Sequence, residues 1–124
     1  MTRFVLLIEK LADSRKKGAV KLLTFDGELD ETNIEEHSPV IYKIIEEGHK
    51  QLTLIFNLQR LRYMNSKAIG YMTDWSNKIR AKGGQIIIVE TPANIKDILV
   101  TIGIDDLFKE YASLEKAKKE LYKR

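Results

Sequence analysis

Four short apolar runs in the chain each predict a β-strand. They cover residues 4–8, 20–25, 52–56 and 85–89. The last two runs are almost continuously apolar, which is typical of strands that are buried on both faces of a sheet. A polar turn that ends at Gly18 separates the first two runs, so we expect these two strands to form an antiparallel hairpin. A fifth, shorter edge strand is predicted over residues 107–111.

The start of the first predicted helix has two interpretations. Ser38 and Pro39 have the sequence of an N-cap followed by the first residue of a helix, and Gly48 supplies its end. Residues 32–37 are then a turn before the helix. Alternatively they form an earlier helical turn that is kinked at Pro39. Apolar residues at helical spacing give this helix its inner face: Ile41, Ile44 and Ile45.

Three further helices are predicted by the same spacing rule. They cover residues 66–82, a segment that opens at Thr91-Pro92 and ends at Gly103, and residues 113–122. Their inner faces comprise, in chain order, Ile69, Met72, Ser76 and Ile79; Ile95, Ile98, Leu99 and Ile102; and Leu114, Ala117 and Leu121. Residues 58–64, between the central strand and the second helix, have no clear period and are interpreted as a connection.

The element order is therefore β-β-α-β-α-β-α-β-α, and we expect residues 1–124 to form one domain. Helices that alternate with buried strands predict an α/β fold with a mainly parallel sheet, to which the hairpin adds an antiparallel strand. In such sheets the functional loops lie at the carboxyl ends of the strands. Here those loops are residues 27–36, 57–66 and 90–92 and the segment after Tyr111.

Composition excludes several classes of site. The 124 residues include no cysteine, so disulfides and thiolate metal sites are excluded, and the spacing of His37 and His49 matches no metal-ligand motif. We expect neither a metal nor a cofactor. No apolar run is long enough to cross a membrane, and the N-terminus lacks the features of a signal peptide. The expected location is the cytoplasm.

Charge is unevenly distributed along the chain. The net charge of +3 resides in residues 109–124, whereas residues 26–36 contain six acidic residues and no basic one. A nucleic-acid-binding protein presents a basic face with aromatic or polar readers, so we expect no nucleic-acid partner here. The acidic segment is either a solvated loop or a surface that recognises a basic partner.

The sequence carries no recognisable catalytic motif. Ser66 lacks the sequence context of a catalytic nucleophile, and Gly83-Gly84 precedes a strand where a phosphate-binding loop follows one. The central apolar run ends in Asn57, so it offers no acidic phosphoacceptor of the kind that receiver domains use. We therefore predict that the protein is not an enzyme.

Ser66 is the most informative single position. It lies at the predicted N-terminus of the helix that follows the central strand, where a phosphate would meet unpaired backbone N–H groups and the positive end of the helix dipole. Alternatively Ser66, or Asn65 before it, is only a helix cap. Tyr71 and Trp75 lie on the same helix, and both are candidates for a partner contact, while Trp75 is equally a candidate for the core.

Several segments in this order resemble the STAS domains of bacterial anti-sigma-factor antagonists. They are Gly27-Glu-Leu-Asp30, Leu54-Ile-Phe-Asn-Leu58, Tyr63-Met-Asn-Ser-Lys-Ala-Ile-Gly70, Lys82-Gly-Gly-Gln-Ile-Ile-Ile-Val89, the helix at Pro92 and Ile102-Gly-Ile-Asp-Asp-Leu-Phe108. The resemblance implies a STAS-like fold with about five strands and four helices. It also implies a binding module without catalytic activity, whose partner is an anti-sigma-factor serine kinase.

The family motif Asp-Ser-Ser/Thr-Gly-Leu-Gly carries its phosphorylation site on the serine after the aspartate, which is Ser66 here. The resemblance implies that the kinase phosphorylates this serine and so dissolves the complex, and that a serine phosphatase restores it. Residues around Ser66 and in the acidic loop are then candidates for binding the partner or an anion: Glu28, Asp30, Asn57, Tyr63, Asn65, Lys67, Ala68 and Gly70.

The sequence departs from the family pattern next to Ser66. Asn57 and Asn65 stand where the family has acidic residues, and Lys67-Ala68 stands where it has Ser/Thr-Gly. These changes predict a more positive local field, in which Lys67 can pair with a phosphate. They also leave a second interpretation open. In that interpretation the chain is a STAS-like scaffold or sensor that binds a nucleotide or another anion near Asn57, Asn65 and Lys67, without a phosphoswitch.

Overall fold

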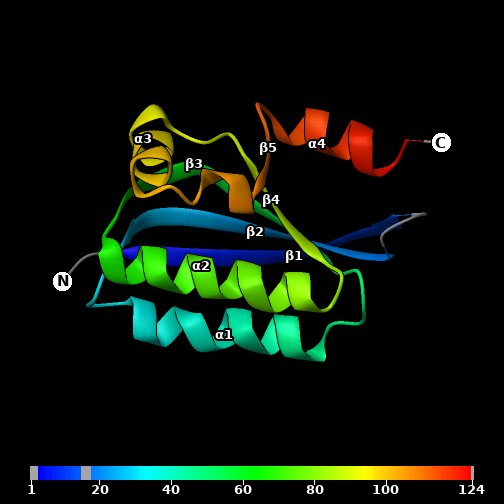
Figure 1. Ribbon diagram of the computed structural model, residues 1–124, viewed down its shortest axis with the longest axis horizontal. Helices are drawn as coiled ribbons and strands as arrows, with labels where there is room; N and C mark the ends of the chain where they lie inside the picture. The colour runs from blue at the N-terminus through cyan, green and yellow to red at the C-terminus, as the bar shows by residue number, and fades with distance from the viewer. Residues whose placement is uncertain (1–2, 15–17, 124) are drawn as a thin grey trace.

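The computed structural model describes residues 3–14 and 18–123 (Figure 1). Its strands form one five-stranded sheet in the order β1-β2-β3-β4-β5. They are β1 (Phe4–Ser14), β2 (Gly18–Leu29), β3 (Thr53–Met64), β4 (Gln85–Val89) and β5 (Lys109–Tyr111). β1 pairs antiparallel with β2, and the other neighbours are parallel. The predicted α/β fold with an antiparallel N-terminal hairpin strand is confirmed.

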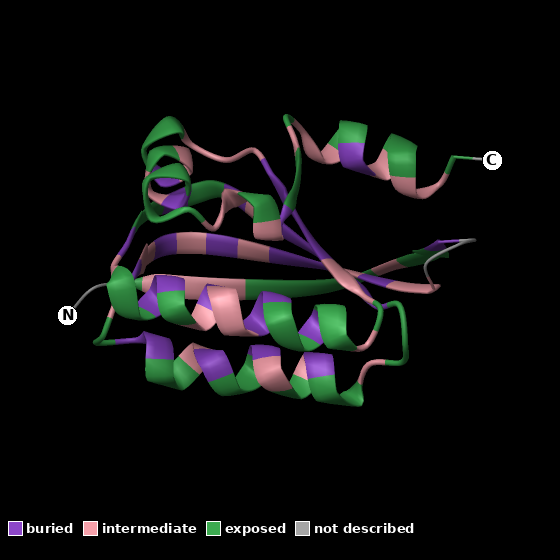
Figure 2. Ribbon diagram, viewed as in Figure 1, coloured by how far each residue is buried: buried purple, intermediate pink, exposed green. Residues whose placement is uncertain are grey.

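The helices of the described residues lie on both faces of this sheet. They are α1 (Ile34–Glu47), α2 (Ser66–Ala81), α3 (Ala93–Ile102), the 3-10 helix η1 (Asp105–Leu107) and α4 (Leu114–Leu121). The main core packs α1, α2 and α3 against one face, which includes Leu54 and Phe56 of β3. A smaller cluster around Ile55 and Ala117 packs α4 against the other face. Figure 2 shows the buried stripe along the sheet-facing sides of α1 and α2.

The strands of the hairpin and the central strand are longer than predicted. β1 extends to Ser14 and β2 to Leu29, and β3 continues to Met64 through the segment that was interpreted as a connection. Beyond residue 57, β3 pairs with β2 alone, because β4 ends opposite Asn57. These extensions carry the loops at the carboxyl ends of β2 and β3 beyond the body of the sheet.

Two register shifts explain why the end of β3 escaped the sequence pattern. The pairing changes between Thr24 and Asp26 and again between Gly27 and Glu28, and each time β3 contributes one extra residue. Each extra residue interrupts the alternation of side chains between the two faces of a strand. In β3 the buried side chains therefore recur every third residue, at Leu58, Leu61 and Met64. This period belongs to neither a regular strand nor a helix.

The first helix begins earlier than Pro39. α1 starts at Ile34 and includes Pro39, so Ser38-Pro39 is not its N-terminus, and the alternative with an earlier helical turn is the one observed. A buried Ile34 and a turn closed by the backbone of Asp30 position this start. Proline inside a helix removes one backbone hydrogen bond, which here is the bond to the carbonyl of Glu35.

The other helices follow the prediction within one residue at their first positions. The N-cap of α3 is Pro92 rather than Thr91, and Gly103 ends α3 with the left-handed φ that favours glycine. Ile102 is 50% exposed, so its assignment to the inner face of α3 was wrong. Trp75 is fully buried, which removes it as a partner contact.

Candidate functional site

Ser66 is the first residue of α2, and its side chain is exposed. The N-cap is Asn65, whose Oδ1 accepts a hydrogen bond from the backbone N–H of Ala68 at 3.0 Å. The backbone carbonyl of Asn65 accepts from Ile69 N–H. Asn65 therefore has the capping role, and within residues 3–14 and 18–123 the Ser66 hydroxyl has no hydrogen-bond partner.

The start of α2 is fixed against the end of β2. Leu29 pairs with Met64 and Glu28 pairs with Tyr63 in the β2–β3 ladder, and the N–H of Asn65 donates to the carbonyl of Leu29 at 3.2 Å. The loops after β2 and β3 therefore lie side by side. The acidic segment therefore lies next to the Ser66 loop.

Polar side chains hold the acidic loop in a tight turn. The Asn33 side chain accepts from the Asp30 N–H at 3.1 Å and donates to the Glu28 carbonyl at 2.8 Å. The Asp30 carboxylate accepts hydrogen bonds from both the N–H and the hydroxyl of Thr32. This turn leads directly into α1 and presents Glu31 and Glu35 toward the start of α2.

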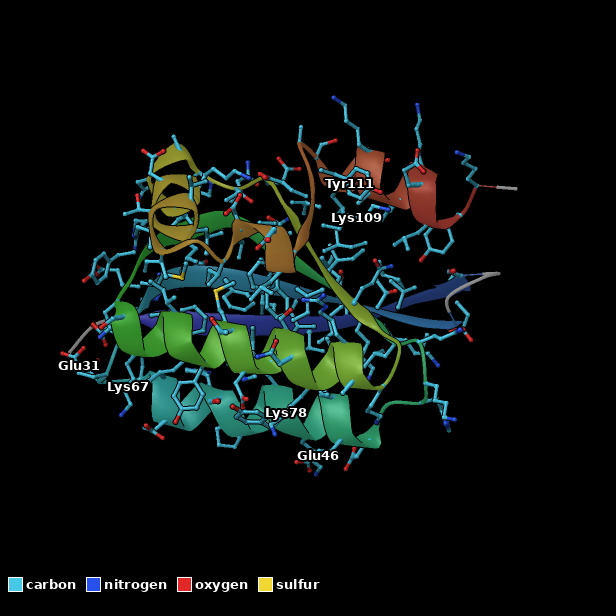
Figure 3. The ribbon with its side chains drawn as sticks, viewed as in Figure 1. Glu31, Glu46, Lys67, Lys78, Lys109 and Tyr111 are labelled. Atoms are coloured by element: carbon cyan, nitrogen blue, oxygen red, sulfur yellow. The ribbon has the colours of Figure 1, made fainter. Side chains whose placement is uncertain are left out.

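Two carboxylates of this loop and helix contact the residues on either side of Ser66. Glu31 accepts a hydrogen bond from the Asn65 amide, and a Glu35 oxygen lies 2.6 Å from Lys67 Nζ. The Tyr71 hydroxyl also donates to Glu35, at 2.9 Å. In Figure 3 the labelled side chains of Glu31 and Lys67 gather at this end of the molecule. The positive field predicted around Ser66 is thus offset by two acidic residues supplied from another part of the chain.

The ion pair shifts the pKa of each of its members. Hydrogen bonds from Lys67 and then Tyr71 lower the pKa of Glu35 below its ordinary value. The same contact raises the pKa of Lys67. The hydrogen bond to Glu35 raises the pKa of Tyr71. All three groups are partly exposed, so the contact is in exchange with solvent and its stabilising effect is small.

The other predicted residues are distributed unequally around Ser66. Tyr63 is exposed beside Glu28, and Gly70 lies on the open side of α2 with no atom near the place of a Cβ. Ala68 is fully buried, so it offers no contact to a partner. Asn57 is remote, since seven residues of strand to Met64 correspond to roughly 20 Å.

Asn57 also lies on the other face of the sheet. Its neighbours Phe56 and Leu58 belong to the core under α1–α3, so the Asn57 side chain is directed to the side of α4. Its Oδ1 accepts a hydrogen bond from the Gln59 N–H at 3.1 Å, at the first register shift. Asn57, Asn65 and Lys67 therefore do not converge on one anion site.

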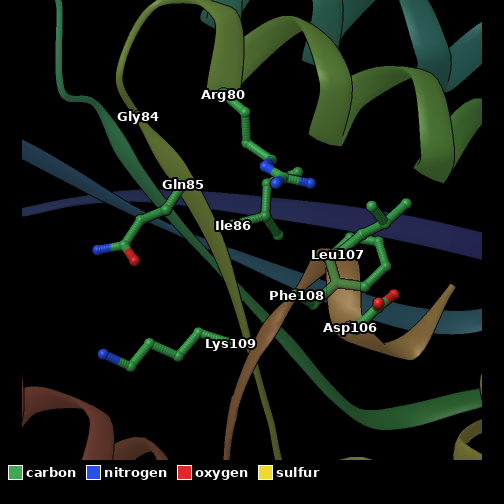
Figure 4. Close-up of a pocket in the computed structure, with 8 residues that line it drawn as sticks. All are labelled: Arg80, Gly84, Gln85, Ile86, Asp106, Leu107, Phe108 and Lys109. Atoms are coloured by element: carbon green, nitrogen blue, oxygen red, sulfur yellow. The ribbon is translucent and has the colours of Figure 1, made fainter.

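A separate hollow lies at the opposite end of α2, with a volume of about 360 Å³. Arg80, Asp106 and Lys109 are among its lining residues. Figure 4 shows the Lys109 and Gln85 side chains extending away from Arg80 and Asp106, so the two cations do not converge. No cluster of metal-ligating side chains occurs in the part of the chain that the structure describes.

The sequence did not predict the contacts of Glu35, nor the contact between Tyr42 and Asp74. The Tyr42 hydroxyl donates to Asp74, which ties α1 to α2 beside the buried Trp75. Burial first, and then Asp74, raise the pKa of Tyr42 above its ordinary value. The sequence does show two adjacent acidic residues, Glu35 and Glu36, in the first turn of α1. It gives no indication that Glu35 contacts Lys67, because the two residues lie far apart along the chain.

The family model of the STAS domain matches residues 12–117. The chain belongs to the STAS domain family. A comparison with curated proteins gives no match. No helix of the described residues in this STAS domain is long and apolar enough to cross a membrane.

Solved structures share the fold of this STAS domain at low sequence identity. The unphosphorylated form of the anti-sigma factor antagonist SpoIIAA is 20% identical, with a TM-score of 0.75 over 94% of this chain and 95% of that one. A putative anti-sigma factor antagonist from Thermotoga maritima is 16% identical, with a TM-score of 0.74 over 94% and 93%. The murine anion transporter Solute Carrier 26 family member A9 is 18% identical, with a TM-score of 0.73 over 94% of this chain and 22% of that one. The same fold thus occurs in anti-sigma factor antagonists and in part of an anion transporter.

Proposed function

We propose that this STAS domain is an anti-sigma-factor antagonist, a non-catalytic binding module that sequesters an anti-sigma-factor serine kinase. Phosphorylation of Ser66 by the bound kinase ends the complex, and a serine phosphatase restores it. The proposal places the protein in the cytoplasm, where ATP is available to the kinase. It is carried by one observation: Ser66 is exposed at the first residue of α2, and its hydroxyl is not used as the helix cap.

The proposed modification is a simple group transfer. The γ-phosphoryl group of ATP forms a bond to Ser66 Oγ, its bond to the β-phosphate breaks, and ADP leaves. The hydroxyl proton passes to a base of the kinase. The capping side chain of Asn65 takes no part, so α2 keeps its N-cap after the reaction.

The phosphate acts on the partner through its charge. It adds about −1.5 to −2 charges at a helix N-terminus, which tolerates an anion without unfolding. Glu31 and Glu35 are already next to this position, so the phosphate makes an acidic surface more acidic. A partner that fits the neutral hydroxyl closely must then desolvate a dianion, which weakens the complex.

Three variants test the proposal in a binding assay with the captured kinase. Ser66→Glu is expected to weaken binding at least about tenfold, and Ser66→Ala to preserve it. Asn77→Glu is the matched control, because it places the same charge on an exposed position of α2 about three turns away. Equal affinity of the Ser66→Glu and Ser66→Ala variants would refute the proposed switch.

A further inference from the structure

Lys67 contacts the carboxylate of Glu35, and it follows directly after Ser66, the proposed position of the phosphate. Its Nζ lies 2.6 Å from Glu35 of α1, and the preceding residue is Ser66. The Glu35 contact joins the first turn of α1 to the first turn of α2. Tyr71 adds the hydrogen bond from its hydroxyl to the same carboxylate.

We infer that Lys67 changes partners when Ser66 is phosphorylated, leaving Glu35 of α1 for the phosphate. The inference rests on the proposed phosphorylation of Ser66 and concerns what that phosphate does within the chain. Glu35 is then an internal competitor for Lys67. The first turn of α1 contacts α2 through both Lys67 and Tyr71 in the unmodified protein, and it loses the Lys67 contact in the phosphorylated one.

The charges around Lys67 favour this exchange. A phosphoserine dianion carries about twice the charge of a carboxylate and offers three acceptor oxygens to the ammonium group. It is attached to the neighbouring residue, whereas Glu35 reaches Lys67 from another helix. The two side chains of the existing pair are 48% and 59% exposed, so no buried contact has to break.

Loss of the Lys67 contact changes the charges around Glu35. The new phosphate joins Glu31 and Glu35 at the start of α2, and Lys67 is the cation in contact with this group. Once Lys67 pairs with the phosphate, Glu35 keeps only its hydrogen bond from Tyr71 and is repelled by the dianion. A partner would therefore meet a changed surface on α1 as well as on α2.

The test uses the full chain without any partner, with phosphoserine incorporated at position 66 during translation. The carboxyl ¹³C resonance of Glu35 is followed through a pH titration by NMR, with and without the phosphate. The inference predicts that the midpoint of Glu35 moves up on phosphorylation. Lys67→Met in the unmodified protein should move it in the same direction. The carboxyl resonance of Glu47, paired with Lys43 at the far end of α1, is the internal control and should not move.

A second titration follows the ³¹P resonance of the phosphoserine itself. If Lys67 has moved to the phosphate, Lys67→Met raises the second ionisation midpoint of the phosphoserine, whereas Lys43→Met leaves it in place. An unchanged Glu35 midpoint on phosphorylation, or a ³¹P midpoint insensitive to Lys67→Met, would overturn the inference. Because no kinase is present, failure of this test is distinct from failure of the proposed partner switch.

Discussion

Replacing Asn65 by alanine removes the side-chain cap of α2, the helix that begins at Ser66. The variant loses the 3.0 Å hydrogen bond from the Ala68 N–H and the exposed contact with Glu31. Loss of an N-cap costs about 1 kcal/mol, and the exposed contact adds little. The unfolding entropy of 124 residues is about 0.26 kcal/mol/K, so the expected decrease in Tm is about 4 °C.

Asn65→Asp separates capping from charge. The carboxylate still accepts from Ala68 N–H and gains about 0.3–1 kcal/mol from the helix dipole. It loses the donor to Glu31 and repels that residue, which is exposed and free to turn away. We expect its Tm to stay within about 2 °C of the wild type.

Thermal unfolding followed by the fluorescence of Trp75 measures both variants, because this residue is the only tryptophan and is fully buried. An unchanged Tm for Asn65→Ala would refute the capping role. An equal loss for Ala and Asp would show that the contact with Glu31, and not the cap, holds the start of α2.

Three further variants test the scaffold. Gly27→Ala should lower the unfolding free energy by at least about 3 kcal/mol in urea titrations, because φ is +123° and a Cβ would lie 2.1 Å from the carbonyl oxygen of Arg3, the residue before β1. Lys82→Met should cost about 1–3 kcal/mol by the same assay, since Lys82 Nζ donates to three carbonyls at the end of α1. The unfolding free energy should decrease above pH 10, and Tyr42→Phe should make this decrease smaller. The reason is that the raised pKa of Tyr42 favours its neutral form in the folded state. That contribution is complete below about pH 10 and falls as the pH rises toward the folded value, which urea titrations at pH 8 and 11 would measure.

Matched controls accompany these variants. Gly70→Ala should be neutral or stabilising by up to about 1 kcal/mol, since nothing lies near its Cβ position in the helix. Lys78→Met changes an exposed lysine of the same helix as a control for Lys82. If Gly70→Ala and Gly27→Ala cost the same, close approach of β1 is not the reason for Gly27. A pH profile unchanged by Tyr42→Phe would remove this residue from the alkaline transition.

The sequence predicted best those helices and strands whose apolar residues follow a single regular spacing. β4 and α2 have a single pattern from end to end, and both were placed within a residue of their observed bounds. The extension of β3 was missed because two register shifts hide its alternation. The start of α1 was ambiguous because Pro39 fits both a helix N-terminus and a tolerated kink.

Only those features of the candidate site that depend on residues close together in the sequence could be predicted. The position of Ser66 at the start of a helix followed from local spacing, and the structure places it there. The pairing of Glu35 with Lys67 depends on how α1 packs beside α2, which no local pattern encodes. Asn57 was grouped with Ser66 because the strand was expected to end there, and the longer strand separates them.

The most direct test of the central claim is the affinity of the wild type and of Ser66→Glu for an anti-sigma-factor serine kinase captured from the source organism. The account predicts that the wild type and Ser66→Ala bind this kinase and that Ser66→Glu binds at least about tenfold more weakly, with Asn77→Glu unchanged. Equal binding by all four proteins, or capture of no such kinase by the wild type, would contradict it.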